Sequence, residues 1–156
     1  MAQIGITEKN RAEVAKVLGI LLADEFVLYT KTRNAHWNVE GPDFHSVHVY
    51  FEELYDELAE WVDEVAERIR SIGHYAPASL KTFLELTHLT ELNAKGNNSK
   101  GFIGELVQDH EAIITYIRES IDKVSEAYKD EGTADFLTGI MEKHEKTAWM
   151  LRSHLK

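Results

Sequence analysis

Apolar residues recur at steps of three and four along most of this 156-residue chain. The pattern is strongest after the break at Gly41 and Pro42, where Asp43 is a candidate cap for a helix that ends near Gly73. Its apolar positions are Phe44, Val47, Phe51, Leu54, Leu58, Val62, Val65 and Ile69. Residues spaced in this way share one face of a helix. The segment is therefore predicted to be a long helix with one buried face.

Three further long helices are predicted from weaker versions of the same pattern. The first is expected to run from about Thr7, a candidate N-cap, to Asn34. The third is expected to start at Asn98 or Ser99 and to end in the charged turn 129–132. The fourth is expected to run from Thr133 to about His154. The buried stripe of the first helix comprises Val14, Val17, Leu18, Leu21, Leu28 and Tyr29. That of the third comprises Phe102, Ile103, Leu106, Val107, His110, Ile113, Ile114, Ile117, Ile121 and Val124.

The stretch between the second and third long helices has a weaker pattern and contains Pro77. A short apolar piece, Leu80 to Leu92, predicts a small helix within this crossover. Four long helices with one long crossover between the second and third describe an all-α, ferritin-like four-helix bundle. We predict that residues 1–156 form one such domain, since a chain of this length buries a sufficient core.

Composition narrows the chemistry that the bundle can carry. The absence of cysteine excludes a disulfide framework, a thiolate metal site and a cysteine nucleophile. The net charge of -10 opposes tight contact with polyanions, although it leaves open whether the acidic residues only solubilise the surface or also gather cations. The first residues lack a basic segment followed by an apolar run, and no stretch approaches a membrane span. A cytoplasmic location is therefore expected.

The second predicted helix carries two pairs of potential metal ligands. His48 with Glu52, and Asp63 with Glu67, are each four residues apart, a spacing that places both members on one helix face. A third imidazole, His36, precedes them in an Ala-His-Trp-Asn run. The fifteen steps from His48 to Asp63 span roughly 22 Å, whereas metal–ligand bonds are only about 2–2.6 Å long. One straight helix therefore cannot close the site, but a second copy of the chain can.

The simplest closure is an antiparallel twofold partner, which brings the histidine end of one helix to the Asp63 and Glu67 end of the other. Such a pair contains two equivalent sites. Imidazole and carboxylate ligands without sulfur suit iron, manganese or zinc, and iron redox chemistry is the sharpest of these options. Taken alone, each pair also has an ordinary interpretation as an exposed contact on a helix surface.

Several other residues allow both a functional and a structural interpretation. Trp37 is either a buried aromatic at a helix end or a redox-active shield beside a metal. Glu25, which interrupts the apolar stripe of the first helix, is interpreted as a polar group at the edge of the bundle rather than a ligand. Glu85 and His88 form a Glu-x-x-His pair of the kind found in di-iron bundles. A single copy on a short connector is interpreted as chance.

A set of ordered positions resembles the Dps family of miniferritins, the DNA-binding proteins from starved cells. The matching residues are Ala35-His36-Trp37-Asn38, Gly41, Phe44, His48, Phe51-Glu52, residues 63–68, residues 132–135 and Trp149. The resemblance implies a hollow dodecamer, built from twofold dimers, that oxidises Fe²⁺ preferably with hydrogen peroxide and stores Fe³⁺ mineral. It also implies that His36, His48 and Glu52 of one subunit face Asp63 and Glu67 of its mate, with Trp37 beside them. Glu52 stands where aspartate is frequent in the family.

The resemblance also implies acidic pores through which iron enters the shell. Asp130, Glu131 and Asp135 resemble the residues that line such pores at threefold axes. The alternative is a solvated acidic turn at a helix N-terminus, where Asp135 favours the helix dipole. The working oxidant, peroxide or dioxygen, and competition by zinc or manganese remain open from the sequence.

DNA binding is expected to be weak or absent, despite the family name. Members that condense DNA use a mobile basic tail, whereas here no Lys or Arg precedes Lys9. Lys9, Arg11 and Lys16 still offer a possible basic patch on an assembled shell. A nucleoid-coating protein with secondary iron chemistry is therefore the alternative function, and a purely structural bundle is the third hypothesis.

Overall fold

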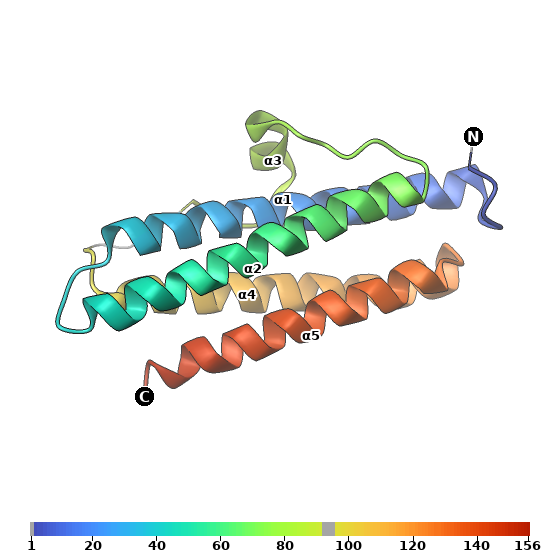
Figure 1. Ribbon diagram of the computed structural model, residues 1–156. Coiled ribbons are helices and arrows are strands. Elements are labelled where there is room, and N and C mark those ends of the chain that lie inside the picture. The colour runs from blue at the N-terminus through green and yellow to red at the C-terminus, as the bar shows by residue number, and fades with distance from the viewer. Residues whose placement is uncertain (1, 92–95) are drawn as a thin grey trace.

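The computed structural model describes residues 2–91 and 96–156. The elements in this part of the chain are α1 (Glu8–Asn38), α2 (Phe44–Ser71), α3 (Leu80–Leu86), α4 (Ser99–Asp122), η1 (Lys123–Ala127) and α5 (Glu131–Ser153). The four long helices form the bundle, and α3 lies outside it against α1 (Figure 1). The prediction of an all-α four-helix bundle with a short helix in the long crossover is confirmed. None of the described helices has the length and apolar character needed to cross a membrane.

Two predicted helix starts are confirmed by side-chain caps. The Thr7 hydroxyl accepts a hydrogen bond from the Asn10 backbone N–H at 3.2 Å. At the start of α4, the Asn98 side-chain oxygen accepts one from the Gly101 N–H at 2.9 Å. Each bond satisfies a backbone donor that has no partner within the helix, which is why the helices begin at these residues.

Asp43 occupies the N-cap position of α2 but makes no side-chain capping bond. Its Oδ2 instead accepts a hydrogen bond of 2.5 Å from the Ser99 hydroxyl. The carboxylate therefore joins the start of α2 to the start of α4. The predicted helix start at Asp43 is correct, although its carboxylate makes no capping hydrogen bond.

The first helix continues to Asn38, one turn beyond its predicted end at Asn34. The Asn38 side-chain amide donates to both the backbone carbonyl and the side-chain oxygen of Asn34, at 3.0 Å and 2.6 Å, and these bonds stabilise the last turn. The chain then turns at Gly41, whose φ of 136° favours glycine. His36 and Trp37 are consequently helical residues, and the helix sets the direction of their side chains.

The end of α4 also differs from the prediction. The regular α-helix stops at Asp122 rather than in the turn 129–132, and the chain continues as the π-helical segment η1. Lys129 then adopts a φ of 59°, which reverses the chain. The last helix, α5, begins at Glu131, two residues before the predicted Thr133.

The helix in the crossover is shorter than predicted. Instead of spanning Leu80 to Leu92, α3 is seven residues long, and the end of the predicted range lies outside the described residues. The Phe83 ring stacks on Phe26 of α1 with centroids 4.7 Å apart, which attaches α3 to the bundle. Asp24 of α1 accepts a 2.7 Å hydrogen bond from the His88 backbone N–H, and so fixes the segment that follows.

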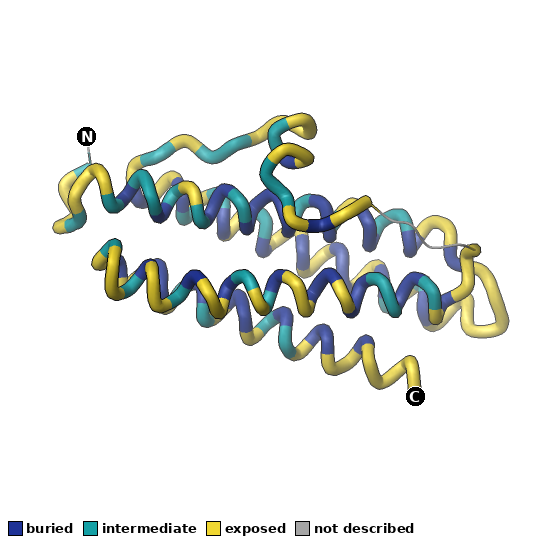
Figure 2. The backbone as a smooth tube through the Cα atoms, turned by 180° about the vertical axis from the view of Figure 1, so that it is seen from behind, coloured by how far each residue is buried: buried dark blue, intermediate teal, exposed yellow. Residues whose placement is uncertain are grey.

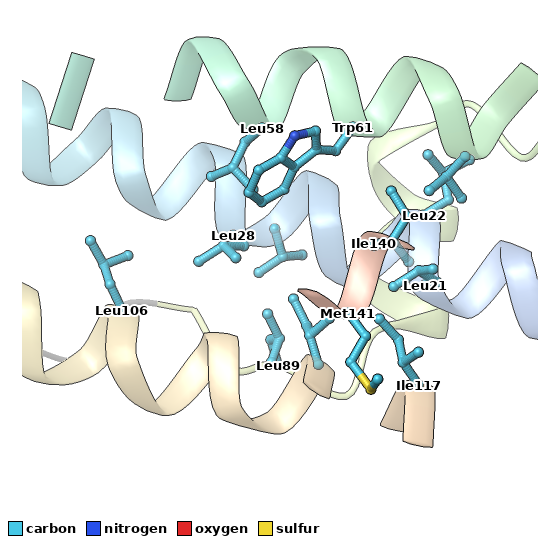
Figure 3. Close-up of a cluster of buried hydrophobic side chains, with 14 of the residues drawn as sticks. Leu21, Leu22, Leu28, Leu58, Trp61, Leu89, Leu106, Ile117, Ile140 and Met141 are labelled. Atoms are coloured by element: carbon cyan, nitrogen blue, oxygen red, sulfur yellow. The ribbon is translucent and has the colours of Figure 1, made fainter. Parts of the chain in front are cut away.

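The core lies between the four long helices, where buried and exposed positions alternate along each of them (Figure 2). Figure 3 shows side chains from α1, α2, α4 and α5 meeting in this space. Fully buried members include Leu18, Leu21, Leu28, Phe51, Leu58, Phe102, Leu106 and Ile113. Each such side chain contributes about 1.5–3 kcal/mol relative to an exposed one, and the bundle is stabilised mainly by this burial.

Glu25 lies in this core, so the interpretation that places it at the bundle edge is wrong. It is 0% exposed, and its Oε1 lies 2.6 Å from Nε2 of the equally buried His144. Nδ1 of His144 lies 2.8 Å from Nδ1 of His110, and the Trp61 ring packs edge-on against His144. Burial and the adjacent His144 lower the pKa of His110 well below its usual value. A polar chain thus links α1, α5 and α4 across an otherwise apolar interior.

Replacing Asp130 with alanine is expected to lower the free energy of unfolding by about 2 kcal/mol. The Asp130 carboxylate is buried, accepts hydrogen bonds from the Thr133 N–H and hydroxyl at 2.9 Å and 2.7 Å, and lies 3.3 Å from Arg68 Nη2. Urea unfolding at one protein concentration measures the loss. Glu131→Ala alters the exposed neighbour and is the control, and an equal loss in both variants would contradict the capping role.

Candidate metal centre

His36 and His48 form an interlocked pair at the junction of α1 and α2. Nδ1 of His36 lies 2.8 Å from the His48 carbonyl oxygen, and Nδ1 of His48 lies 2.8 Å from the His36 carbonyl oxygen. The rings stack with centroids 3.8 Å apart at an angle of 23°. A carbonyl oxygen only accepts, so each Nδ1 carries the proton and donates. In the neutral imidazoles each Nε2 is then left with a free lone pair, the form that binds a metal.

Tyr55 of α2 links this pair to Glu52. Its ring packs edge-on against His36 with centroids 5.2 Å apart, and its hydroxyl donates to Glu52 Oε1 at 3.3 Å. Burial, followed by the charge of Glu52, raises the pKa of the Tyr55 phenol. The phenol therefore keeps its proton near neutral pH and remains a donor to the carboxylate. Three of the five predicted ligands, His36 of α1 and His48 and Glu52 of α2, thus lie at the junction of these two helices.

Asp63 and Glu67 lie on exposed turns of α2, away from the histidine pair. Among the described residues, neither carboxylate makes a hydrogen bond or an ion pair, whereas the adjacent Glu64 pairs with Lys143 at 2.6 Å. Over the residues that the structure describes, no three His, Asp or Glu side chains of one chain converge on a point where a metal ion fits. The structure thus divides the predicted ligand set between the junction of α1 and α2 and a separate stretch of α2.

Exposed apolar side chains accompany the histidine pair. Trp37 is 65% exposed and Phe44 is 43% exposed, and the Phe44 ring lies 5.0 Å from that of His48. The interpretation of Trp37 as a buried aromatic is therefore wrong for the single subunit. Large apolar groups gathered beside a polar site are typical of a surface that another protein covers.

An arginine that was not among the predicted site residues packs among aromatic rings next to the site. Arg33 lies over the ring of Tyr55, with its guanidinium carbon 4.2 Å from the ring centroid. Tyr29, Arg33 and Trp37 are spaced four residues apart, so their shared helix face was visible in the sequence. The packing of that face against Tyr55 was not, because it depends on how α1 and α2 are aligned.

The three residues proposed to line a pore differ in their surroundings. Asp130 is only 2% exposed, because its carboxylate caps α5 and contacts Arg68. It is therefore engaged within the subunit. Glu131 and Asp135 are exposed, and Glu131 accepts a hydrogen bond from the Ser125 hydroxyl at 2.7 Å. A role in a pore remains a prediction for these two residues.

In the suggested basic patch of Lys9, Arg11 and Lys16, the arginine is buried. Arg11 is 3% exposed, and its guanidinium donates to the Ile72 carbonyl at 3.0 Å and pairs with Glu8 at 2.5 Å. Lys16 is exposed but lies 2.7 Å from the Glu13 carboxylate. Arg11 is consequently not available to contact phosphate, and the pairing of Lys16 weakens the patch further.

Glu85 and His88 do not form a joint site. Glu85 lies 3.7 Å from Lys81 Nζ on the exposed side of α3. The His88 imidazole instead lies 3.2 Å from the buried carboxylate of Asp24. Although they are three residues apart in the sequence, the two side chains therefore do not face a common ligand.

Comparison with known proteins places these features in a family. Residues 15–156 match the ferritin-like domain family. DNA protection during starvation protein 2 of Bacillus anthracis is 40% identical over 143 residues, which cover 92% of this chain and 97% of that protein. The crystal structure of a Dps protein from Bacillus brevis has a TM-score of 0.89 and 34% identity, and covers 97% of this chain and 100% of that chain.

A second crystal structure extends the similarity to the whole length of both chains. The Dps protein from Vibrio cholerae O1, described as a member of a broad superfamily of ferritin-like diiron-carboxylate proteins, has a TM-score of 0.89, 27% identity and 100% coverage of each chain. Fold, length and sequence therefore agree across these relatives. The chain belongs to the Dps family of ferritin-like proteins.

Proposed function

We propose that this protein is an iron-storing miniferritin that oxidises Fe²⁺, preferably with hydrogen peroxide, at sites shared by two subunits. The observation that carries the proposal is the divided ligand set. Among the described residues, no group pairs with the Nε2 atoms of His36 and His48, which lie where α1 meets the start of α2, or with the carboxylates of Asp63 and Glu67, which lie roughly 22 Å along α2. An antiparallel twofold partner supplies each half with its complement.

The exposed apolar groups support the same arrangement. Trp37 and Phe44 lie beside the histidine pair, and Val49, the next residue after His48, is 38% exposed. A partner subunit that covers them gains about 25 cal/mol for each Å² of apolar surface removed from water. Burial of these groups and completion of the metal site then occur at one interface. The proposed assembly is a hollow dodecamer of about 210 kDa built from such pairs.

The residues of the chain have separate tasks in this site. The His36 and His48 Nε2 atoms bind ferrous iron as neutral imidazoles, already in the required tautomer because each Nδ1–H is engaged by a carbonyl. Glu52, oriented by the Tyr55 hydroxyl, and the partner's acidic pair offset the charge of the iron. A ligand set of imidazole and carboxylate suits both ferrous and ferric iron.

Iron is the substrate and cargo in this proposal. Two ferrous ions each give one electron to hydrogen peroxide, whose O–O bond breaks. The ferric ions hydrolyse to the mineral, so that 2 Fe²⁺ + H₂O₂ + 2 H₂O gives 2 FeO(OH) + 4 H⁺. Pairwise electron transfer consumes peroxide without releasing hydroxyl radical. The description of the Vibrio cholerae protein as a diiron-carboxylate superfamily member supports this chemistry.

The Asp63→Asn, Glu67→Gln double variant is expected to oxidise iron with peroxide at least about 100-fold more slowly than the wild type. Both changes keep the shape of the side chains and remove the charges that hold iron, and even residues that only support metal ligands cost about 10–100-fold when changed. The measurement is the absorbance of the ferric product after anaerobic ferrous loading and peroxide addition.

Glu64→Gln is the matched control, because it changes an acidic residue between the two positions that pairs with Lys143 instead. Its oxidation rate is expected to remain near that of the wild type. Size-exclusion chromatography shows whether each variant still assembles. An assembled double variant that oxidises iron at the wild-type rate would show that Asp63 and Glu67 are not iron ligands.

A further inference from the structure

Four residues beside the candidate metal centre form what we name the arginine–aromatic cluster: Tyr29, Arg33 and Trp37 of α1, and Tyr55 of α2. The Arg33 guanidinium carbon lies 4.2 Å from the ring centroid of Tyr55, 5.3 Å from that of Trp37 and 5.6 Å from that of Tyr29. Its Nη1 also donates to the Tyr29 hydroxyl at 3.1 Å. One cation is therefore held against three oxidisable rings.

The cluster lies where oxidant and iron are proposed to meet. The Tyr55 ring packs against that of His36, and its hydroxyl donates to Glu52. Trp37 follows His36 directly on α1. Within the described part of the chain, Arg33 makes no ion pair with a carboxylate. Its contacts are with the rings.

A cation held against an aromatic face makes that ring harder to oxidise. Removal of an electron from the ring leaves a positive charge next to the guanidinium. The attraction between the cation and the ring's electrons is then lost. In a partly buried site this attraction is screened less than in water. The effect depends on the charge at position 33 rather than on the volume of the side chain.

We propose that Arg33 protects Tyr55 and Trp37 from one-electron oxidation during iron turnover. This inference rests on the proposed function for the source of the oxidant. In the side reaction, a single ferrous ion gives one electron to hydrogen peroxide and forms ferric iron, hydroxide and hydroxyl radical. The radical then takes an electron from Tyr55, whose proton passes to Glu52, or from Trp37, and becomes hydroxide. Arg33 disfavours either transfer.

The test uses charge-removing and charge-keeping variants of the full-length assembled protein. Arg33→Gln and Arg33→Met remove the charge, while Arg33→Lys keeps it. The azide radical, generated without iron, takes one electron from an aromatic ring and becomes azide. Peptide mass spectrometry then measures oxidation at Trp37 and Tyr55 relative to Trp149. Trp149 of α5 is the internal reference for radical dose, because among the described residues no Arg or Lys lies over its ring.

The charge-free variants are expected to raise these oxidation ratios about tenfold, and Arg33→Lys is expected to stay near the wild type. Equal ratios in wild type, Arg33→Gln and Arg33→Met would overturn the proposal, as would a rise in Arg33→Lys as large as that in Arg33→Gln. A second arm repeats the measurement with ferrous iron and peroxide. If the wild type oxidises no iron there, the proposed function fails, while the iron-free arm still decides the role of Arg33.

Discussion

Two inactive variants are expected to recover about a quarter of the wild-type iron oxidation rate when they assemble together. The first carries His36→Asn and His48→Asn, since the asparagine amide replaces the Nδ1–H donor but supplies no Nε2. The second carries Asp63→Asn and Glu67→Gln. Each proposed site takes histidines from one chain and these acids from its mate. A mixed pair therefore has one intact site, and random mixing makes half of the pairs mixed.

The measurement is the initial oxidation rate of shells formed by unfolding and refolding equal amounts of the two chains together. Shells of either variant alone are expected to stay inactive. So are preformed shells of the two variants that are merely combined, because their subunits have not exchanged. No recovery in co-assembled shells whose mixed composition is verified by mass spectrometry would show that the ligands are not divided between subunits.

Lys31→Met is expected to lower the free energy of unfolding by about 3–5 kcal/mol. Lys31 is 5% exposed, lies 2.5 Å from Asp109 Oδ2 and 3.8 Å from Glu105 Oε2, and donates to the Thr90 carbonyl at 2.9 Å. Methionine keeps most of the length and none of the charge. The buried Asp109 carboxylate then loses its cation. Urea unfolding at a fixed protein concentration measures the effect.

The loss is also expected to depend on pH. Burial raises the pKa of Asp109, and Lys31 acts in the opposite direction. A pKa raised by folding means that the folded chain binds the proton more tightly, so stability falls as pH rises from the usual value of 3.8 through the raised one. Without Lys31 this decline extends to higher pH. Lys16→Met, at an exposed site on the same helix, is the control, and a similar loss there would contradict the role of burial.

The long helices could be predicted from sequence because each repeats an apolar stripe over many turns. Predictions failed where one polar contact decides the outcome. The amide of Asn38 adds a turn to α1, and the Asp43 carboxylate bonds to the Ser99 hydroxyl rather than to a backbone N–H of its own helix. Such bonds depend on which segments meet in space, and periodicity within one segment carries no information about that.

The candidate site was predictable to the same extent. The spacing of His48 and Glu52, and that of Asp63 and Glu67, is a property of one helix, so the sequence reveals it. The contact of Arg33 with Tyr55 depends on the alignment of two helices. The burial of Glu25 depends on three helices that meet in the core, and a carboxylate within an apolar stripe does not by itself indicate a histidine partner.

The chain of contacts from Glu25 through His144 to His110 has a consequence for synthesis on the ribosome. α1 is synthesised before α5 and carries a carboxylate whose imidazole partner lies on α5. Until α5 docks, a bundle closed by the earlier helices would hold Glu25 among apolar side chains without its imidazole, at a cost of several kcal/mol. The nascent chain is therefore expected to delay closing its core until α5 is available.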